Sequence, residues 1–472
     1  MINMRESKQI AIIGGGITGL TAAYYLQKKI KEEQLPYKVK LVEASDRLGG
    51  KIKSVKRDGY TFERGPDSFL IRKPSAARLV KEAGLEDDLI KNGTGQSYIL
   101  VDKKLHKMPG GSYMGIPTQV SPFLFSGIFS AKGKLRAGLD FIRPKGKQTG
   151  DQSLGLFFRR RFGDELVENL VEPLLSGIYA GDIDELSLMA TFPNFYELEQ
   201  EHRSLVKGLR KTVPKKKNNK GKKPSMFYSL KNGLESLVDA VEHKLEPGTV
   251  VKGTGVDHIE QKDDHYHLLL SDGTVVQVDS VVMATPHFAA RRMLSQYEFM
   301  DAFKEMPATS VANVALAFDQ SAFKKDVDGT GFVVSRNSDY RITACTWTHK
   351  KWPQSAPEGK ALLRCYIGRP GDEQVVDLSD QEIVDIVLHD LKKIMKITKE
   401  PEFAVVSRWK NAMPQYAVGH KDRLNHVRAK MEADLPGLFL AGSSYEGIGI
   451  PDCIDQGEAA VEQVLSFLHH QR

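Results

Sequence analysis

The sequence predicts a mixed α/β fold in which one nucleotide-type domain is split along the chain. A strand, a glycine turn and a helix open the chain at 9–33, and a second strand follows at 38–43. Further apolar strands that end in turns lie at 280–284 and 437–441. Strands that alternate with helices indicate parallel pairing, and 472 residues exceed one compact core. We therefore expect a split Rossmann-like domain with other regions inserted between its parts.

The inserted regions differ in periodicity. Residues 74–210 carry apolar residues at helical spacing, as in 154–161 and 164–175, whereas 311–318 and 361–368 have the character of strands. Turn residues at Asp102-Lys103 and Asp272-Gly273 predict two hairpins. We expect a nucleotide-binding domain in three parts, at 1–73, 225–296 and 405–472. A mainly helical domain is expected at 74–210, a basic flexible loop at 211–224 and a substrate-binding sheet domain at 297–404.

Composition is that of an ordinary globular protein, with 41% hydrophobic and 27% charged residues. The net charge of +7 is concentrated in 207–223, which lacks interleaved aromatic residues. We interpret that run as a solvated loop and expect no nucleic-acid partner. The alternative explanation for the basic run is that it attracts an acidic substrate or a membrane surface.

The sparse cysteines and the lack of a leader-like segment favour the cytoplasm. Cys345, Cys365 and Cys453 form no CxxC pair or disulfide framework. No apolar run reaches the length of a membrane span. The apolar region 114–129 favours a buried helical hairpin, with a surface touching lipid as the alternative. The histidines have no metal-ligand spacing, so we predict no metal site.

The first turn of the chain has the spacing of a dinucleotide site. An apolar strand precedes it and a helix follows it, as G-x-G-x-x-G requires. The first glycine permits the tight turn, the third lets a pyrophosphate approach the backbone, and the last lets the helix pack on the strand. The helix N-terminus offers free N–H groups to phosphate. The residues of this turn are Gly14, Gly15, Gly16, Ile17, Thr18 and Gly19.

The residues that follow favour FAD over NAD. Glu43 ends the second strand, where its carboxylate can accept bonds from ribose hydroxyls and would repel the 2′-phosphate of NADP. Arg47 is a candidate for the pyrophosphate, and Gly50 lets the chain pass close to the flavin. A second glycine-rich helix start, beyond Gly442, suits the pyrimidine end of a reduced flavin, whose negative charge a helix N-terminus stabilises.

Three longer motifs mark a family resemblance. Residues 14–19, 43–51 and 442–451 resemble the flavin amine-oxidase group. The stretches 65–69, 172–182 and 449–453 narrow this to the bacterial porphyrinogen oxidases of haem biosynthesis, of the Gram-positive, Bacillus type. The resemblance covers essentially the whole chain.

The resemblance implies the fold, the cofactor and the reaction. We expect non-covalent FAD and oxygen-consuming, six-electron oxidation of coproporphyrinogen III to coproporphyrin III with release of hydrogen peroxide, and potentially also of protoporphyrinogen IX. The flavin performs the chemistry, so no catalytic side chain is assigned. By matching position, the FAD contacts are Gly14 to Gly19, Glu43, Ala44, Lys51, Gly65, Pro66, Asp67, Ser68, Val256, Trp409, Gly449, Ile450 and Pro451.

Two residues are implied on the substrate side. Lys73 matches a basic residue that faces a propionate, although a Lys offers a point charge without the fork of an Arg. Tyr366 matches an aromatic that packs on the macrocycle. The basic balance favours a tetra-acid substrate over a di-acid. Peripheral contact with a membrane or with another enzyme of the pathway stays open, as does the oligomeric state.

Three rival functions use the same fold. An amine or amino-acid oxidase is the first; the stretch 441–445 has no cysteine for covalent FAD, which argues only against the covalent type. A carotenoid-type desaturase that passes electrons to a quinone is the second. A flavin-binding module with a regulatory or scaffolding role is the third.

Overall fold

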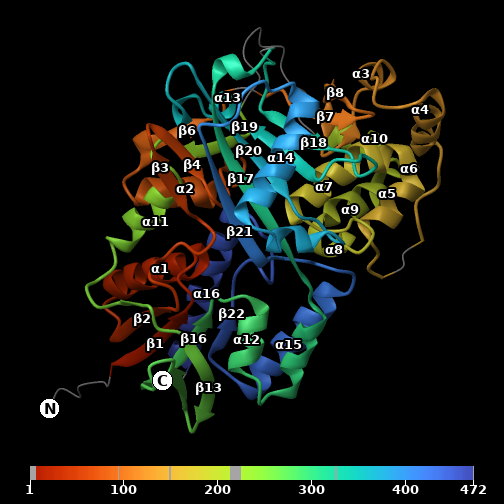
Figure 1. Ribbon diagram of the computed structural model, residues 1–472. Coiled ribbons are helices and arrows are strands. Elements are labelled where there is room, and N and C mark those ends of the chain that lie inside the picture. The colour runs from red at the N-terminus through yellow and green to blue at the C-terminus, as the bar shows by residue number, and fades with distance from the viewer. Residues whose placement is uncertain (1–6, 94, 148–149, 213–224, 325–326, 471–472) are drawn as a thin grey trace, which may run out of the picture.

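The computed structural model describes residues 7–93, 95–147, 150–212, 225–324 and 327–470. Three regions are visible in Figure 1: a parallel sheet with its helices, a long and mainly antiparallel sheet, and a group of helices beside that second sheet. Most of the predicted basic loop 211–224 lies outside the described residues.

The first sheet joins strands from both ends and the middle of the chain. Its order is β12, β2, β1, β16 and β22, and all its pairs are parallel. The split Rossmann-like fold predicted from the sequence is therefore confirmed. In that order the strands span Val250–Lys252, Tyr37–Glu43, Lys8–Ile13, Ser280–Met283 and Leu438–Leu440.

Two helices from opposite ends of the chain lie side by side against this sheet (Figure 1). They are α1 (Ile17–Glu33) and α16 (Ile450–His470). A Cβ on Gly457 would lie 2.7 Å from the Thr18 carbonyl oxygen, so only glycine allows this close crossing. Helix α16 begins at Ile450, directly after the C-terminal glycine-rich turn.

The rest of this region covers the two faces of the sheet. The predicted hairpin at Asp272-Gly273 is present between β14 and β15. A three-stranded sheet of β13, β14 and β15 packs with α12 and α15 around one core, and α2, α11 and the short strands β5, β6 and β11 share the core on the other side. The hairpin of β3 and β4 packs instead against the second sheet. In the order named, the bounds of these elements are Val256–Lys262, His265–Leu270, Val275–Val278, His287–Met293, His420–Asp434, Pro74–Glu82, Glu235–Glu242, Phe69–Leu70, Leu89–Lys91, Phe227–Leu230, Ser54–Arg57 and Tyr60–Glu63.

The second sheet has seven strands in the order β21, β17, β20, β19, β18, β7 and β8. The amphipathic α14 (Asp380–Met395) packs against it behind a capping box of Ser379 and Glu382, and α13 spans Thr348–Lys351. In sheet order the strands are Phe403–Pro414, Ala308–Asp319, Lys360–Ile367, Ile342–Trp347, Gly331–Val334, Tyr98–Val101 and Lys104–Lys107.

This sheet takes strands from outside the predicted sheet domain. The hairpin β7–β8 turns at Asp102-Lys103 as predicted, but it belongs to the stretch 74–210 and pairs through β7 with β18. Strand β21 runs across the predicted boundary at 404/405 and pairs with β17. Backbone pairing between distant segments leaves no local signal, and for this reason the predicted boundaries differ from the sheet.

The helical region is built around buried aromatic residues and one buried charge network. Arg161 is fully enclosed; its Nε donates to Asp140 at 2.7 Å and its Nη1 to Glu199 at 3.2 Å. A π-helical turn (Val167–Val171) joins α6 to α7. The helices α3 to α10 and the strands β9 and β10 span Val120–Leu124, Ala131–Gly138, Leu154–Phe162, Asp164–Leu166, Glu172–Tyr179, Leu188–Thr191, Pro193–His202, Leu205–Thr212, Ser112–Tyr113 and Ile116–Pro117.

The expectation of a buried helical hairpin at 114–129 is only partly met. Ile116, Phe123 and Phe129 are buried, but Phe125 on the loop after α3 is 87% exposed. The segment contributes one strand of a two-stranded ladder, which contains Pro117, and then one short helix. Pro122 lies in the first turn of that helix, where proline is tolerated. In the described part of the chain, no helix is long and apolar enough to cross a membrane.

Candidate functional site

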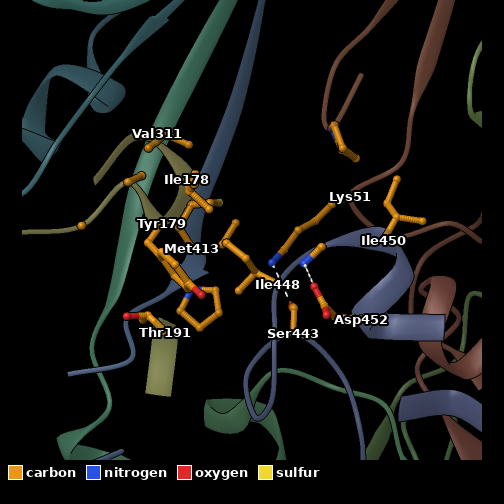
Figure 2. Close-up of a pocket in the computed structure, with 18 of the residues that line it drawn as sticks. Lys51, Ile178, Tyr179, Thr191, Val311, Met413, Ser443, Ile448, Ile450 and Asp452 are labelled. Atoms are coloured by element: carbon orange, nitrogen blue, oxygen red, sulfur yellow. Dashed lines mark hydrogen bonds between the residues drawn. The ribbon is translucent and has the colours of Figure 1, made fainter. Parts of the chain in front are cut away.

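A cavity of about 3060 Å³ lies where the parallel sheet meets the seven-stranded sheet and the helical region. A single small-ligand pocket measures roughly 300–1,000 Å³, so this cavity has room for a dinucleotide and a second large molecule. Figure 2 shows part of its wall, with Lys51 and Ser443 on one side and Tyr179 and Met413 on the other. All but three of the residues predicted from the sequence line it.

The first glycine turn forms the dinucleotide end. Gly14 has φ +102°, and a Cβ there would lie 2.9 Å from the Ala284 carbonyl oxygen. A Cβ on Gly19 would lie 1.9 Å from the Gly14 oxygen, so glycine is required for helix α1 to pack on β1. A Cβ on Gly16 would instead meet no protein atom within 4 Å, and Gly16 lines the cavity. This open cradle, at a helix N-terminus whose N-cap side chain is absent, fits a pyrophosphate.

Glu43 closes the other side of that cradle. Its Oε2 accepts from the Gly15 N–H at 2.6 Å, and its Oε1 accepts from the Ser45 N–H at 2.9 Å. The carboxylate lines the cavity beside Ala44 and Val256. Two backbone N–H groups thus hold the Glu43 carboxylate on the cavity wall, where the sequence predicts a contact with the ribose hydroxyls.

Arg47 does not reach the cavity. Its guanidinium donates to the carbonyl oxygens of Leu48, Gly50 and Ile52 and lies 3.7 Å from Glu235. The assignment of Arg47 to the pyrophosphate is therefore corrected: this side chain shapes the loop that carries Gly50. Gly15 and Gly19, which also do not line the cavity, act through packing.

Lys51 supplies a cation to the cofactor side. Its Nζ donates to Ser443 Oγ at 3.3 Å, as Figure 2 shows, and no carboxylate lies within 4 Å of it in the described chain. Burial lowers the pKa of this ammonium, opposed by the field of Cys453. An anion bound here would restore the lost solvation.

Charged side chains from the region of the seven-stranded sheet hold the turn 65–68 in place. A Cβ on Gly65 would lie 1.8 Å from the Lys51 oxygen, so the two loops stack backbone on backbone. Lys351 Nζ lies 2.9 Å from both Asp67 oxygens, and Arg364 donates to the Gly65 oxygen at 2.7 Å. Burial opposes ionisation of Asp67, but Lys351 and Arg364 hold its pKa well below the usual range.

Two aromatic residues of the same sheet border this turn. Trp409 on β21 donates from Nε1 to the Arg64 oxygen at 2.7 Å and lines the cavity next to Gly65. Tyr366 on β20 lines the cavity with the Arg364 cation 5.4 Å from its ring centre. Burial raises the pKa of the Tyr366 phenol, which therefore stays neutral.

Lys73 is already paired. It lines the cavity, but its ammonium forms an ion pair with Asp452 in the first turn of α16. Asp452 Oδ2 also accepts from the Gly449 N–H at 3.2 Å. Lys73 thus ties α2 to the helix start at Ile450-Pro451, and this contact competes with a substrate carboxylate for its charge.

The C-terminal turn brings a second helix N-terminus to the cavity. Gly442 has φ +124° and follows β22, and Gly449, Ile450 and Pro451 line the cavity at the start of α16. Within this turn, Gly442 donates its N–H to Gln456 at 3.0 Å. The turn and the start of α16 lie on the same side of the cavity as Lys51 (Figure 2).

Sequence reasoning missed the apolar wall. Ile178, Tyr179, Thr191 and Met413 line the cavity opposite Lys51, and Ile448 lines it nearer to Lys51 (Figure 2). They come from α7, α8, β21 and a C-terminal loop, and no spacing in the sequence connects them. Ile178 and Tyr179 belong to the motif 172–182, but that motif served only to recognise the family resemblance, and no contact was assigned to it.

Other titratable groups near the cavity are structural. His287 is buried, lies 2.8 Å from the Met306 oxygen and 3.2 Å from Ser444, and burial lowers its pKa. The three cysteines are free and buried. Among the described residues no group of three or more His, Cys, Asp or Glu side chains is arranged to hold a metal ion.

A split parallel sheet with a glycine cradle, a carboxylate on the cavity wall beside it and a second helix N-terminus defines a dinucleotide-binding flavoprotein. The chain belongs to the family of flavin containing amine oxidoreductases, whose model matches residues 17–465. Its cofactor is FAD, and the open cradle at Gly16, the Glu43 acceptors and the Lys51 cation are the residues of this chain that fit it.

Relatives of known name extend over the whole chain. A coproporphyrinogen III oxidase of Bacillus subtilis is 56% identical over 98% of this chain and 98% of its own length. One from Staphylococcus aureus is 45% identical over 98% of this chain and 100% of its own. A crystal structure assigned as a protoporphyrinogen oxidase of Exiguobacterium sp. 255-15 is 38% identical, with a TM-score of 0.87 over 97% of this chain and 99% of that one. A putrescine oxidase at 14% identity and a TM-score of 0.68 shares the fold.

Proposed function

We propose that this protein oxidises coproporphyrinogen III to coproporphyrin III in haem biosynthesis, with molecular oxygen as the acceptor. Three molecules of oxygen take up the six electrons and six protons, which leave as three molecules of hydrogen peroxide. The observation that carries the proposal is the 56% identity over 98% of the chain to the coproporphyrinogen III oxidase of Bacillus subtilis. Protoporphyrinogen IX is the second candidate substrate, because a plant protoporphyrinogen oxidase is 30% identical over 97% of the chain.

The cavity supports this proposal by its size and its lining. The bound FAD supplies the hydride acceptor. The chain holds the cofactor through the cradle at Gly16, Glu43 and Lys51, and it encloses the second half of the cavity with apolar side chains such as Ile178 and Met413. An apolar wall excludes water from a macrocycle and strengthens every polar contact that the macrocycle makes.

The first test is turnover in air. The purified holoprotein should show a flavin spectrum and should generate porphyrin fluorescence faster from coproporphyrinogen III than from protoporphyrinogen IX. Peroxide should accumulate at three equivalents per porphyrin. A flavin-loaded protein that turns over neither substrate would exclude this function and leave the amine oxidase, the desaturase and the non-enzymatic module to be tested.

We further propose that FAD is bound without a covalent link and that the protein acts in the cytoplasm. The stretch 441–445 offers no thiol, and burial raises the pKa of the nearby Cys453 to about 11. Denaturation followed by filtration should release all of the flavin. The free state of all three cysteines supports a reducing compartment.

Peripheral membrane contact at α3 is the remaining part of this proposal. Phe125, Leu124 and Val120 are 87%, 49% and 44% exposed, and Lys104 and Lys107 lie on nearby β8. Sedimentation with anionic lipid vesicles should decrease in Phe125→Ser. Equal sedimentation of variant and wild type would exclude this face as the contact.

A further inference from the structure

Not every basic residue of the cavity wall is paired with a carboxylate. Five of the cations that line the cavity form ion pairs with carboxylates of the described chain, so their charges are already compensated. These pairs are Lys73–Asp452, Arg336–Asp182, Arg341–Asp372, Lys351–Asp67 and Lys410–Asp377.

Four other cations of the lining have no hydrogen bond or ion pair from the side chain to any described residue. Three of them, Arg72, Arg292 and Lys421, are exposed, so water solvates their charges. Arg369 is the exception because it is half-buried. A charge that has lost part of its water without gaining a partner attracts an opposite charge most strongly.

The turn that carries Arg369 is fixed in place. It follows β20, and Gly368 at φ +94° packs so closely that a Cβ would lie 2.8 Å from the Ser310 oxygen. Arg341 holds Asp372 with two hydrogen bonds of 2.9 and 2.8 Å, and the Asp372 N–H donates to the Arg369 oxygen at 2.8 Å. The turn is therefore preorganised, and its one carboxylate on the cavity wall is occupied by Arg341.

Arg369 lies three residues beyond Tyr366, and both line the cavity. We propose that Arg369 binds a carboxylate of the porphyrinogen and so selects the substrate with more carboxylates. The inference rests on the proposed function for the identity of the macrocycle. The planar guanidinium can donate two parallel hydrogen bonds to one carboxylate, which a lysine cannot do.

Equilibrium binding of the product tests this role without turnover. Coproporphyrin III is titrated into FAD-loaded wild type, Arg369→Gln and Arg369→Lys, and porphyrin fluorescence is followed. A hydrogen bond to a charged group contributes about 1.5–3 kcal/mol, so Arg369→Gln should bind about tenfold to a hundredfold more weakly. Arg369→Lys should lie between the two. Coproporphyrin III tetramethyl ester should bind equally to all three proteins.

The matched control is Lys244→Gln, which removes an exposed cation outside the cavity and should bind coproporphyrin III as wild type does. Equal affinity of wild type and Arg369→Gln for coproporphyrin III, or no binding to wild type, would overturn the role of Arg369. Wild type that binds the porphyrin with the predicted Arg369 dependence but oxidises neither porphyrinogen would overturn the proposed function and leave this site standing. Flavin content and the thermal midpoint confirm that each variant is folded.

Discussion

The cavity has two walls that differ in composition: the wall formed by the parallel-sheet region presents mostly backbone, and the wall formed by the seven-stranded sheet presents mostly side chains. The dinucleotide wall is mostly backbone: Gly14, Gly16 and Gly65 bring main-chain atoms to the cavity, and the carboxylate of Glu43 lies beside them. The sheet wall is mostly side chains, and there Arg364 and Lys351 compensate the negative charge of Asp67. A backbone wall tolerates few residues other than glycine, whereas a side-chain wall depends on charge pairing across long sequence distances.

The largest expected effect is on the sheet wall. Arg364→Met removes a fully buried guanidinium and leaves Asp67 with Lys351 alone. Breaking a buried pair destabilises a protein by roughly 3–5 kcal/mol; since Lys351 remains, we expect about 3 kcal/mol in denaturant unfolding. The control is Arg336→Met, whose partner Asp182 is partly exposed and whose loss should be about 1 kcal/mol or less. Equal losses of unfolding free energy in the two variants would show that the buried Arg364 contributes no more to stability than the partly exposed Arg336.

A buried carboxyl behind the same turn should give the protein a pH-dependent stability. Burial raises the pKa of Glu63 to about 7, although the Leu234 N–H at 2.7 Å and the Ser54 hydroxyl at 2.8 Å favour the ionised form. The folded protein thus holds a proton that the unfolded chain releases near pH 4.5, so stability falls as pH rises from about 4.5 to about 7, by up to ~3 kcal/mol.

Glu63→Gln should remove that slope, because its amide keeps the acceptor for Leu234 and cannot ionise. Thermal midpoints of both proteins between pH 5 and 8 measure the difference. A variant whose midpoint changes with pH as steeply as that of wild type would show that another group is responsible.

The dinucleotide wall is best tested by two glycines of one turn. In Gly19→Ala the new Cβ would lie 1.9 Å from the Gly14 oxygen, so the apoprotein should lose about 1–3 kcal/mol of stability. In Gly16→Ala the Cβ meets no protein atom within 4 Å, so apoprotein stability should be unchanged while FAD affinity falls at least about tenfold. Calorimetry and flavin fluorescence separate the two. Retention of FAD by Gly16→Ala would contradict the cradle.

The smallest effect concerns Lys73, which lines the cavity but is already paired. Lys73 pairs with Asp452, and both side chains are about one-third exposed, at 33% and 27%. Lys73→Met should therefore cost about 1 kcal/mol or less and should raise the KM for coproporphyrinogen III by less than about threefold. A tenfold rise in KM at unchanged kcat would show that Lys73 leaves Asp452 to hold a carboxylate, as the sequence predicted.

The sequence by itself determined the fold class and the cofactor, and all but three of the residues it predicted for the site line one cavity. Glycine spacing at 14–19 is readable because Gly14 has a positive φ and Gly19 packs directly on the Gly14 backbone, and both constraints are local. The tertiary structure decided that β7, β8 and β21 share one sheet, that Arg47 faces its own loop, and that Lys73 is paired. It also placed Lys351 beside Asp67, 284 positions away, and left the Arg369 side chain without a partner among the described residues. Charge compensation is set by which segments meet in space, and no local pattern in the chain encodes it.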